Sequence, residues 1–174
     1  RDTDRSRGLG DVYKRQAVPY LDQQYMLGDA LMVAPVFRED KVAQYYLPEG
    51  TWTELLTGET KEGGRWYKGT YDYFSMPLYI RENSIVVRGN CDTRPDYDYA
   101  DHATVCVYQL KDAAETKVPD VHGNTVFTVK AVKEGDAVKV SVEGAHTELK
   151  VEVFVGNEKK EAVLAADADE VVVA

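Results

Sequence analysis

Residues 125–142 read TVFTVKAVKEGDAVKVSV. Apolar and polar side chains alternate on both sides of the segment 133–136. Alternation with a period of two, carried by β-branched residues, is typical of strands that have one buried and one solvated face. The glycine and aspartate between the two runs favour a turn. The stretch therefore predicts strands at 125–130 and 137–142, joined by a turn.

The same alternation appears at 103–108, at 149–155 and, over a shorter length, at 170–173. His122-Gly123-Asn124 is a further turn signal. Together these runs predict a β-sandwich over the second half of the chain. The last residue, Ala174, follows directly on an apolar run, and such a strand edge is normally paired or blunted. We therefore expect this domain to be truncated at its end.

The first half begins with a continuous apolar run at 30–36, which predicts a strand buried on both faces. Strands are expected next at 44–47 and 51–56, on either side of Pro48-Glu49-Gly50. Proline presets φ and glycine accepts a positive φ, so this trio favours a turn. Short strands separated by turns are the signature of a sandwich or small barrel.

Further strands are expected at 64–67, 73–80 and 84–88. Residues 89–101 then break the pattern with glycine, asparagine, aspartate and proline, and we place the domain boundary there. Because no stretch longer than about eight residues has a helical period, little helix is expected. The predicted fold is all-β, with two small antiparallel β-sandwich-type domains in tandem at 17–90 and 91–174.

Residues 1–16, RDTDRSRGLGDVYKRQ, are polar, lack a period and differ from everything that follows. We interpret them as an extraneous or disordered leader, with an assembly artefact as the alternative origin. They are left out of the fold prediction for that reason.

The formal net charge is −9, and an acidic chain repels phosphate backbones and anionic lipid. Nucleic acid and membrane are therefore not expected as partners. No apolar run approaches the roughly 20 residues that a membrane-spanning helix needs. The 12 tyrosines suit both half-buried sheet faces and sugar contacts, and composition does not separate these uses.

Cys91 and Cys106 form no CxxC pattern and have no histidine at metal-ligand spacing, so neither a zinc site nor a cofactor is expected. A disulfide between them is the less favoured interpretation, because a chain of this size folds without one.

Asp29 precedes a strand and is interpreted as a turn or capping residue rather than a catalytic carboxylate. Trp52 and Trp66 have the chemistry to stack on a sugar ring, but within strands tryptophan more often fills the core. We favour the core for both and keep sugar stacking as the alternative.

The acidic residues Asp96, Asp98 and Asp101 are closely spaced, but they lack the glycine and terminal glutamate of a calcium loop. A solvated linker is the preferred interpretation. A second group has no partner pattern and is assigned to surface, turn or structural positions: His102, His122, His146, Ser75 and Ser84. No catalytic, cofactor-binding or metal-binding residue is therefore expected.

Five blocks between residues 25 and 84 resemble, in order, the segment after the catalytic barrel in glycoside hydrolase family 31. They are YMLGDALMVAPV at 25–36, YLPEGTWT at 46–53, LTGE at 56–59, GGRW at 63–66 and PLYIRENS at 77–84. The later part, from Pro95-Asp96-Tyr97 onward, resembles the bacterial α-xylosidase branch of that family.

The resemblance implies an enzyme with an N-terminal β-sandwich, a (β/α)8 barrel, and proximal and distal C-terminal β domains. It implies retaining hydrolysis of an α-xyloside or α-glucoside by two carboxyl groups about 5 Å apart. In the family both lie upstream of the block that holds Gly28 and Asp29. None of the 30 acidic residues of this chain matches either role, so the fragment alone is expected to be inactive.

The expected partners are the barrel of the same parent chain and, through that parent, oligosaccharide. A homo-oligomer of the parent and a cytoplasmic location in a bacterium are further expectations. The strand at 30–36 predicts an apolar patch where the barrel would be absent. The alternative is a free-standing carbohydrate-binding or structural β-sandwich protein without catalytic activity.

Overall fold

A computed structural model describes residues 23–174, which form 15 β-strands and no helix. No part of this range contains a helix that could cross a membrane. The all-β prediction is therefore confirmed, and the expected leader at 1–16 lies outside the described residues. The chain divides into two compact units, the first ending at Ile80 and the second running from Arg81 to Ala174.

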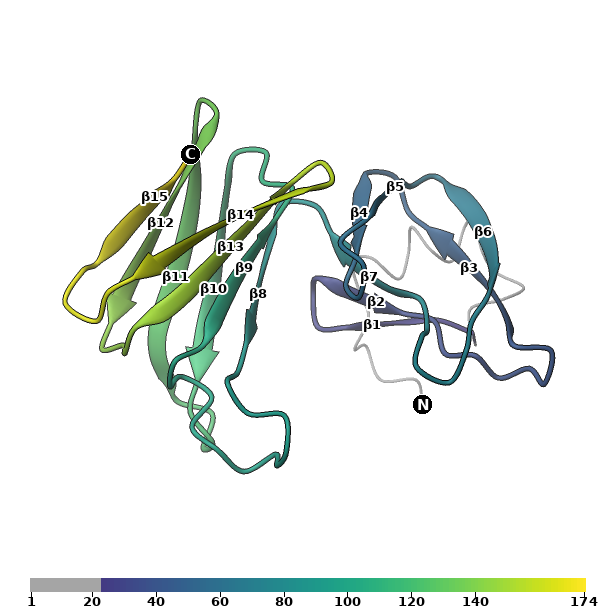
Figure 1. The fold of residues 1–174 in the computed structure, drawn as a ribbon, viewed down its shortest axis with the longest axis horizontal. Coiled ribbons are helices and arrows are strands. Elements are labelled where there is room, and N and C mark those ends of the chain that lie inside the picture. The colour runs from purple at the N-terminus through teal and green to yellow at the C-terminus, as the bar shows by residue number, and fades with distance from the viewer. Residues whose placement is uncertain (1–22) are drawn as a thin grey trace, which may run out of the picture. The chain divides into compact units, whose positions relative to one another are not determined.

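The first unit contains a five-stranded sheet and a two-stranded sheet (Figure 1). The larger sheet has the order β1 (Tyr25–Leu27), β2 (Leu31–Val33), β7 (Leu78–Arg81), β4 (Thr51–Glu54) and β5 (Thr60–Glu62). The smaller sheet pairs β3 (Val42–Leu47) with β6 (Arg65–Thr70) in antiparallel register. Pro48-Glu49-Gly50 connects β3 to β4 as expected, with Gly50 at a φ of 116°.

Large side chains fill the core of the first unit. Its buried members are Met32, Ala34, Ala43, Tyr45, Leu47, Trp52 and Tyr79. Trp52 is 1% exposed, and its indole N–H donates to the carbonyl oxygen of Pro48 at 2.8 Å. A buried indole needs such an acceptor, because an unpaired donor in the core is costly.

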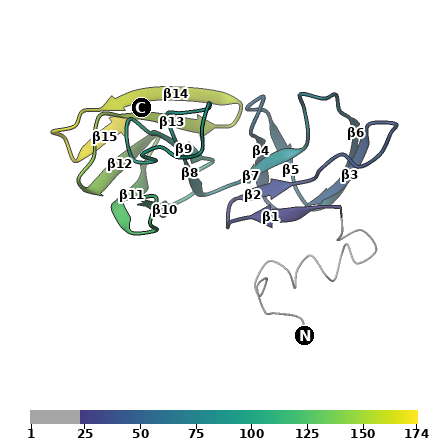
Figure 2. The same ribbon diagram turned by 90° about the horizontal axis from the view of Figure 1, so that it is seen from below.

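The second unit is a sandwich of two four-stranded sheets (Figures 1 and 2). One sheet has the order β10 (Ala113–Pro119), β11 (Thr125–Glu134), β12 (Ala137–Gly144) and β15 (Glu170–Val173). The other has the order β14 (Glu158–Leu164), β13 (Leu149–Val155), β9 (Thr104–Tyr108) and β8 (Ser84–Arg88). The inward side chains of both sheets make one core, rich in valine, that includes Val105, Phe127, Val140 and Val151.

Two features of the second unit differ from the prediction. Strand β8 pairs with β9, opposite residues 104–108, whereas the sequence placed 84–88 in the first domain. Strand β9 also pairs in parallel with β13, although only antiparallel pairing was expected. Both features are pairings between residues distant in sequence, which a local pattern does not contain.

The strand expected at 73–80 begins only at Leu78. The Asp72 carboxylate accepts from the Phe74 backbone N–H at 2.9 Å and from the Ser75 hydroxyl at 2.7 Å. An aspartate that bonds the backbone two residues later forms a turn in place of a strand. Tyr73 and Phe74 therefore project from a loop into solvent.

Candidate docking interface

The paired segments of β1, β2 and β7, in the larger sheet of the first unit, are apolar on both faces. Across β1, β2 and β7, Met26 lies opposite Met32, and Met32 lies opposite Tyr79. These three side chains face the core of the unit. Residues that alternate with them along each strand must point to the other face.

Two cross-strand rows occupy that other face. One row is Tyr25, Val33 and Leu78, and the other is Leu27, Leu31 and Ile80. We call these six residues the docking face. Val33 and Ile80 are buried within the chain, whereas Tyr25 and Leu27, on the edge strand, are 53% and 59% exposed.

No side chain of the docking face carries a charge. A sheet that is apolar on both faces is typical of a middle layer, with other elements packed on each side. The arrangement is therefore suited to burying a second protein surface. The sequence indicated the two-faced strand at 30–36 but assigned no strand to Tyr25–Leu27, so the edge of this face was missed.

Exposed aromatic side chains also gather on two neighbouring loops of the first unit. Phe37 follows β2, and Tyr73 and Phe74 precede β7. The loops are joined because the Tyr71 N–H donates to the Lys41 carbonyl at 2.9 Å. The Lys41 ammonium lies 5.3 Å from the centre of the Tyr73 ring, within the range of a cation–π contact.

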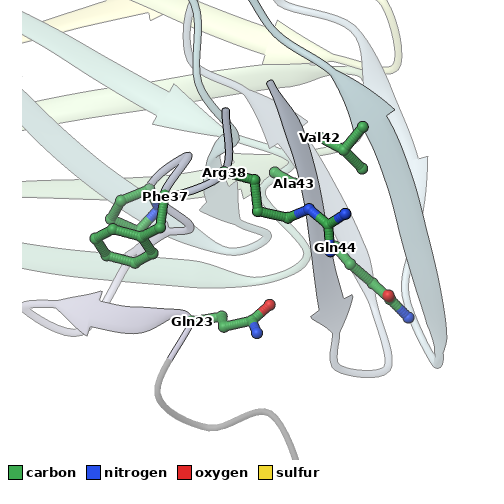
Figure 3. A pocket seen from close by; sticks show the side chains of 7 residues that line it. Gln23, Phe37, Arg38, Val42, Ala43 and Gln44 are labelled. Carbon is green, nitrogen blue, oxygen red and sulfur yellow. The ribbon is translucent and has the colours of Figure 1, made fainter. Parts of the chain in front are cut away.

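Near Phe37 the surface contains a hollow of about 270 Å³ (Figure 3). Gln23 lies two residues before β1, Phe37 and Arg38 follow β2, and the third side is formed by β3. The lining residues are Gln23, Pro35, Phe37, Arg38, Val42, Ala43 and Gln44. No motif in the sequence marked the hollow.

Tyr45, Tyr79 and Lys61 form a polar cluster at the edge of the first core. The Tyr45 and Tyr79 hydroxyls are 2.9 Å apart, and Lys61 Nζ donates to them at 3.2 and 2.6 Å. Burial raises the pKa of both phenols well above their usual value near 10. Both stay protonated at neutral pH, so the cluster joins strands and supplies no base.

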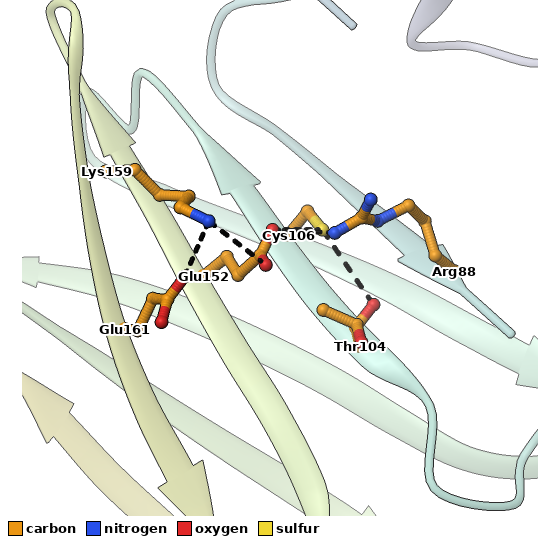
Figure 4. A network of polar contacts seen from close by, with 6 residues as sticks. All are labelled: Arg88, Thr104, Cys106, Glu152, Lys159 and Glu161. Carbon is orange, nitrogen blue, oxygen red and sulfur yellow. Dashed lines mark hydrogen bonds and ion pairs between the residues drawn. The ribbon is translucent and has the colours of Figure 1, made fainter. Parts of the chain in front are cut away.

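A second polar cluster lies on the outer face of the sheet that contains β8, β9 and β13 (Figure 4). Arg88 donates to the Glu152 carboxylate at 2.7 Å, and Lys159 bridges Glu152 and Glu161. The Cys106 sulfur lies 3.6 Å from Glu152 Oε2. Burial raises the pKa of Cys106 to about 11, so the thiol is protonated and a poor nucleophile.

The tryptophans occupy structural positions. Trp52 is in the core, and half-buried Trp66 packs against Tyr46 with ring centres 5.5 Å apart. Asp29 lies in the exposed turn between β1 and β2. These placements favour the core and turn interpretations over sugar stacking and catalysis.

The acidic run at 96–101 forms a loop held by its own side chains. Asp98 accepts from the Ala100 backbone N–H at 3.0 Å, and Tyr97 contacts Tyr99 edge to face. Within residues 23–174, no three histidine, cysteine, aspartate or glutamate side chains converge on a point where a metal could bind. His102 contacts the neighbouring Asp101, and the three histidines do not meet.

The remaining sequence candidates have local roles. The Ser75 hydroxyl donates to Asp72, and the Ser84 hydroxyl donates to the Glu82 carbonyl at 3.3 Å. Cys91 and Cys106 are both free thiols, in agreement with the preferred interpretation. Neither serine lies beside a histidine that could activate it.

Two family sequence models match successive parts of the chain. The C-terminal domain of glycosyl hydrolase family 31 matches residues 10–86, and the C-terminal domain of alpha-xylosidase YicI matches residues 98–174. Alpha-xylosidase XylQ of Lactiplantibacillus pentosus is 31% identical over 139 residues, which is 78% of this chain and 18% of that protein. Alpha-glucosidase 2 of Bacillus thermoamyloliquefaciens is 26% identical over 79% of this chain and 17% of its own length.

Solved structures show the same fold. The family 31 alpha-xylosidase of Xanthomonas citri covers 88% of this chain with a TM-score of 0.66 and 25% identity, using 19% of its own chain. The cycloalternan-forming enzyme of Listeria monocytogenes covers 88% with a TM-score of 0.73 and 21% identity, using 18% of its chain. The chain thus spans about a fifth of the length of these larger proteins.

Proposed function

The chain belongs to the C-terminal β domains of glycosyl hydrolase family 31, and from this premise we propose that it supports the catalytic barrel of an α-glycosidase. The parent enzyme acts on an α-xyloside or an α-glucoside. This finer assignment is supported by the alpha-xylosidase and alpha-glucosidase names of the relatives.

The docking face is the observation that carries the proposal. It places six apolar side chains on the side of the sheet away from the core, with Tyr25 and Leu27 more than half exposed. Burying apolar surface contributes about 25 cal/mol per Å², so this face favours association with a complementary surface. The rest of the parent chain is covalently linked to this face. It is therefore the partner surface present at the highest local concentration.

The physical contribution of this chain is rigidity. A retaining glycosidase holds two carboxyl groups about 5 Å apart on its barrel, and small displacements reduce the rate. Packed layers around a site keep such groups in place. On this proposal the two β units brace the barrel and supply no reacting group.

The test uses the catalytic portion of the parent and this chain, expressed separately and then mixed. Hydrolysis of p-nitrophenyl α-xyloside and α-glucoside is followed together with co-elution. We expect no hydrolysis by this chain alone, co-elution with the catalytic portion, and a gain in its activity. Nitrophenol released by the purified chain itself, or failure of the two parts to associate, would contradict the proposal.

The alternative is a free-standing carbohydrate-binding module with a tryptophan platform. Burial of Trp52 and packing of Trp66 against Tyr46 count against such a platform. The alternative therefore ranks second, although a different part of the first unit has features that suit a sugar.

A further inference from the structure

The hollow beside Phe37 combines an exposed ring with an apolar floor. Phe37 is 73% exposed, while Ala43 is buried and Val42 is half-buried. Pro35, two residues before Phe37, also lines the hollow. An aromatic face and aliphatic carbons of this kind suit the C–H face of a sugar ring.

The polar side chains that line the hollow are two glutamines and one arginine. Gln23 and Gln44 carry amides, each of which both donates and accepts hydrogen bonds. Within residues 23–174, neither side-chain amide has a hydrogen-bond partner. Two amides in the lining of a hollow that also holds an aromatic ring match the paired donor and acceptor character of adjacent sugar hydroxyls.

The hollow is close to electrically neutral. Among the lining residues described, Arg38 is the only charged one. Its Nε and Nη2 atoms bind both oxygens of Asp40, at 2.9 and 2.6 Å. This bond holds the pKa of Asp40 to about 2, so the pair is fully ionised at neutral pH. The positive charge of Arg38 is therefore already neutralised by Asp40 and is not available to an anionic ligand.

We propose that this hollow binds a neutral carbohydrate, with one sugar ring stacked on Phe37 and its hydroxyls bonded to Gln23 and Gln44. The volume of about 270 Å³ is at the lower end for small-molecule sites, so it accommodates a single ring of a longer glycan. The site would hold a glycan against the first unit. It uses none of the residues of the docking face.

The test is a titration of the 174-residue chain with isomaltose, maltose and xylose, followed by saturation-transfer NMR and calorimetry. Sodium sulfate serves as the anionic probe. We expect at least one sugar to bind and sulfate not to compete. Phe37→Ala should weaken binding about tenfold, because the stacking surface is lost.

Phe74→Ala is the matched control, because Phe74 is 94% exposed and does not line the hollow. It should leave sugar binding unchanged, and thermal unfolding checks that both variants keep the fold. Gln44→Ala, on the exposed side of β3, should weaken binding without changing the unfolding temperature.

The proposal is wrong if none of the three sugars binds at millimolar concentration. It is also wrong if Phe37→Ala binds as well as the original chain, or if Phe74→Ala loses as much affinity. Competition by sulfate would point to an anion site instead. Because Leu27 and its neighbours are outside the hollow, these outcomes are separate from those of the barrel-association test.

Discussion

Leu31 lies directly opposite Ile80 across β2 and β7, on the face of the sheet away from the core. The next pair in the same ladder, Met32 and Tyr79, belongs to the core. One short run of sequence thus supplies apolar side chains to two separate surfaces. Val33 and Ile80 on the second surface are already buried within the chain, whereas Tyr25 and Leu27 at its edge are more than half exposed. On our proposal a further layer of protein covers this exposed edge.

Trp52 is predicted to be the largest single contributor to the first core. Trp52→Ala should lower the free energy of unfolding by about 3–5 kcal/mol, because it leaves a cavity and removes the donor to Pro48. Trp66→Ala, at a half-buried position, should cost less. Urea unfolding of the two variants measures both costs, and a larger loss for Trp66→Ala would contradict the assignment of the core.

Gly63 and Gly64 are predicted to tolerate alanine very differently. A Cβ on Gly63 would lie 1.5 Å from the Pro48 carbonyl oxygen, which is backbone and cannot move aside cheaply. A Cβ on Gly64 has ordinary space, and its φ of 75° costs about 1–2 kcal/mol for alanine. Gly63→Ala should therefore lower the unfolding temperature far more than Gly64→Ala. Equal shifts in thermal unfolding would show that the turn after β5 is arranged differently.

Stability of the first unit should fall at alkaline pH. Burial raises the pKa of Tyr45 and Tyr79 in the folded state, while in the unfolded chain both titrate near 10. The unfolded state therefore loses protons first, and the stabilisation present below about pH 10 is lost progressively above it. Urea midpoints measured from neutral to strongly alkaline pH should decline, and Tyr45→Phe should flatten the decline. A stability that rises over this range would contradict the burial of the two phenols.

The two thiols should react at different rates. Cys91 is only half-buried, and a hydrogen bond to Thr93 lowers its pKa, whereas burial raises the pKa of Cys106 to about 11. A thiol reagent near neutral pH should modify Cys91 quickly and Cys106 only after unfolding. Cys91→Ser should remove the fast phase. Two equal rates in the native chain would show that Cys106 is accessible.

Strands with clean alternation were predicted accurately from the sequence. The run at 103–108 contains β9, and the runs at 125–130 and 137–142 lie in β11 and β12. The turn between them is tight, with Glu134 paired to Ala137 across Gly135-Asp136. In these strands the buried face is continuous, so the pattern alone specifies the structure.

Some edge strands were missed, although β8 and β15, which also lie at sheet edges, were predicted with the bounds that the structure gives. Strands β10 and β14 are exposed on one side, and β14 has the polar sequence EKKEAVL. Each belongs to the sheet through backbone pairing with one neighbour, β11 or β13. Backbone pairing leaves little trace in side-chain pattern, which also explains why β1 and the outer edge of the docking face were not predicted.

The domain division required information that no local pattern holds. Residues 84–88 look like a continuation of the preceding strands, but their partner is 104–108 beyond the acidic loop. The compact units of the structure separate after Ile80, whereas the sequence placed the boundary after residue 90, which lies between the two family-model matches at 10–86 and 98–174. The hollow could likewise not be predicted from the sequence, because its lining residues come from separate segments between Gln23 and Gln44.

The most direct test of the account places a charge on the docking face. Leu27→Lys and Leu56→Lys change two leucines of similar exposure, 59% and 54%, and only Leu27 belongs to that face. Both variants of the isolated chain should unfold at the original temperature. Joined to the catalytic portion of the parent, Leu27→Lys should lower both the unfolding temperature and the hydrolysis of p-nitrophenyl α-xyloside or α-glucoside, because an unpaired charge would be buried. Leu56→Lys should change neither. Equal behaviour of the two variants in the joined enzyme would contradict the docking face as the surface that meets the barrel.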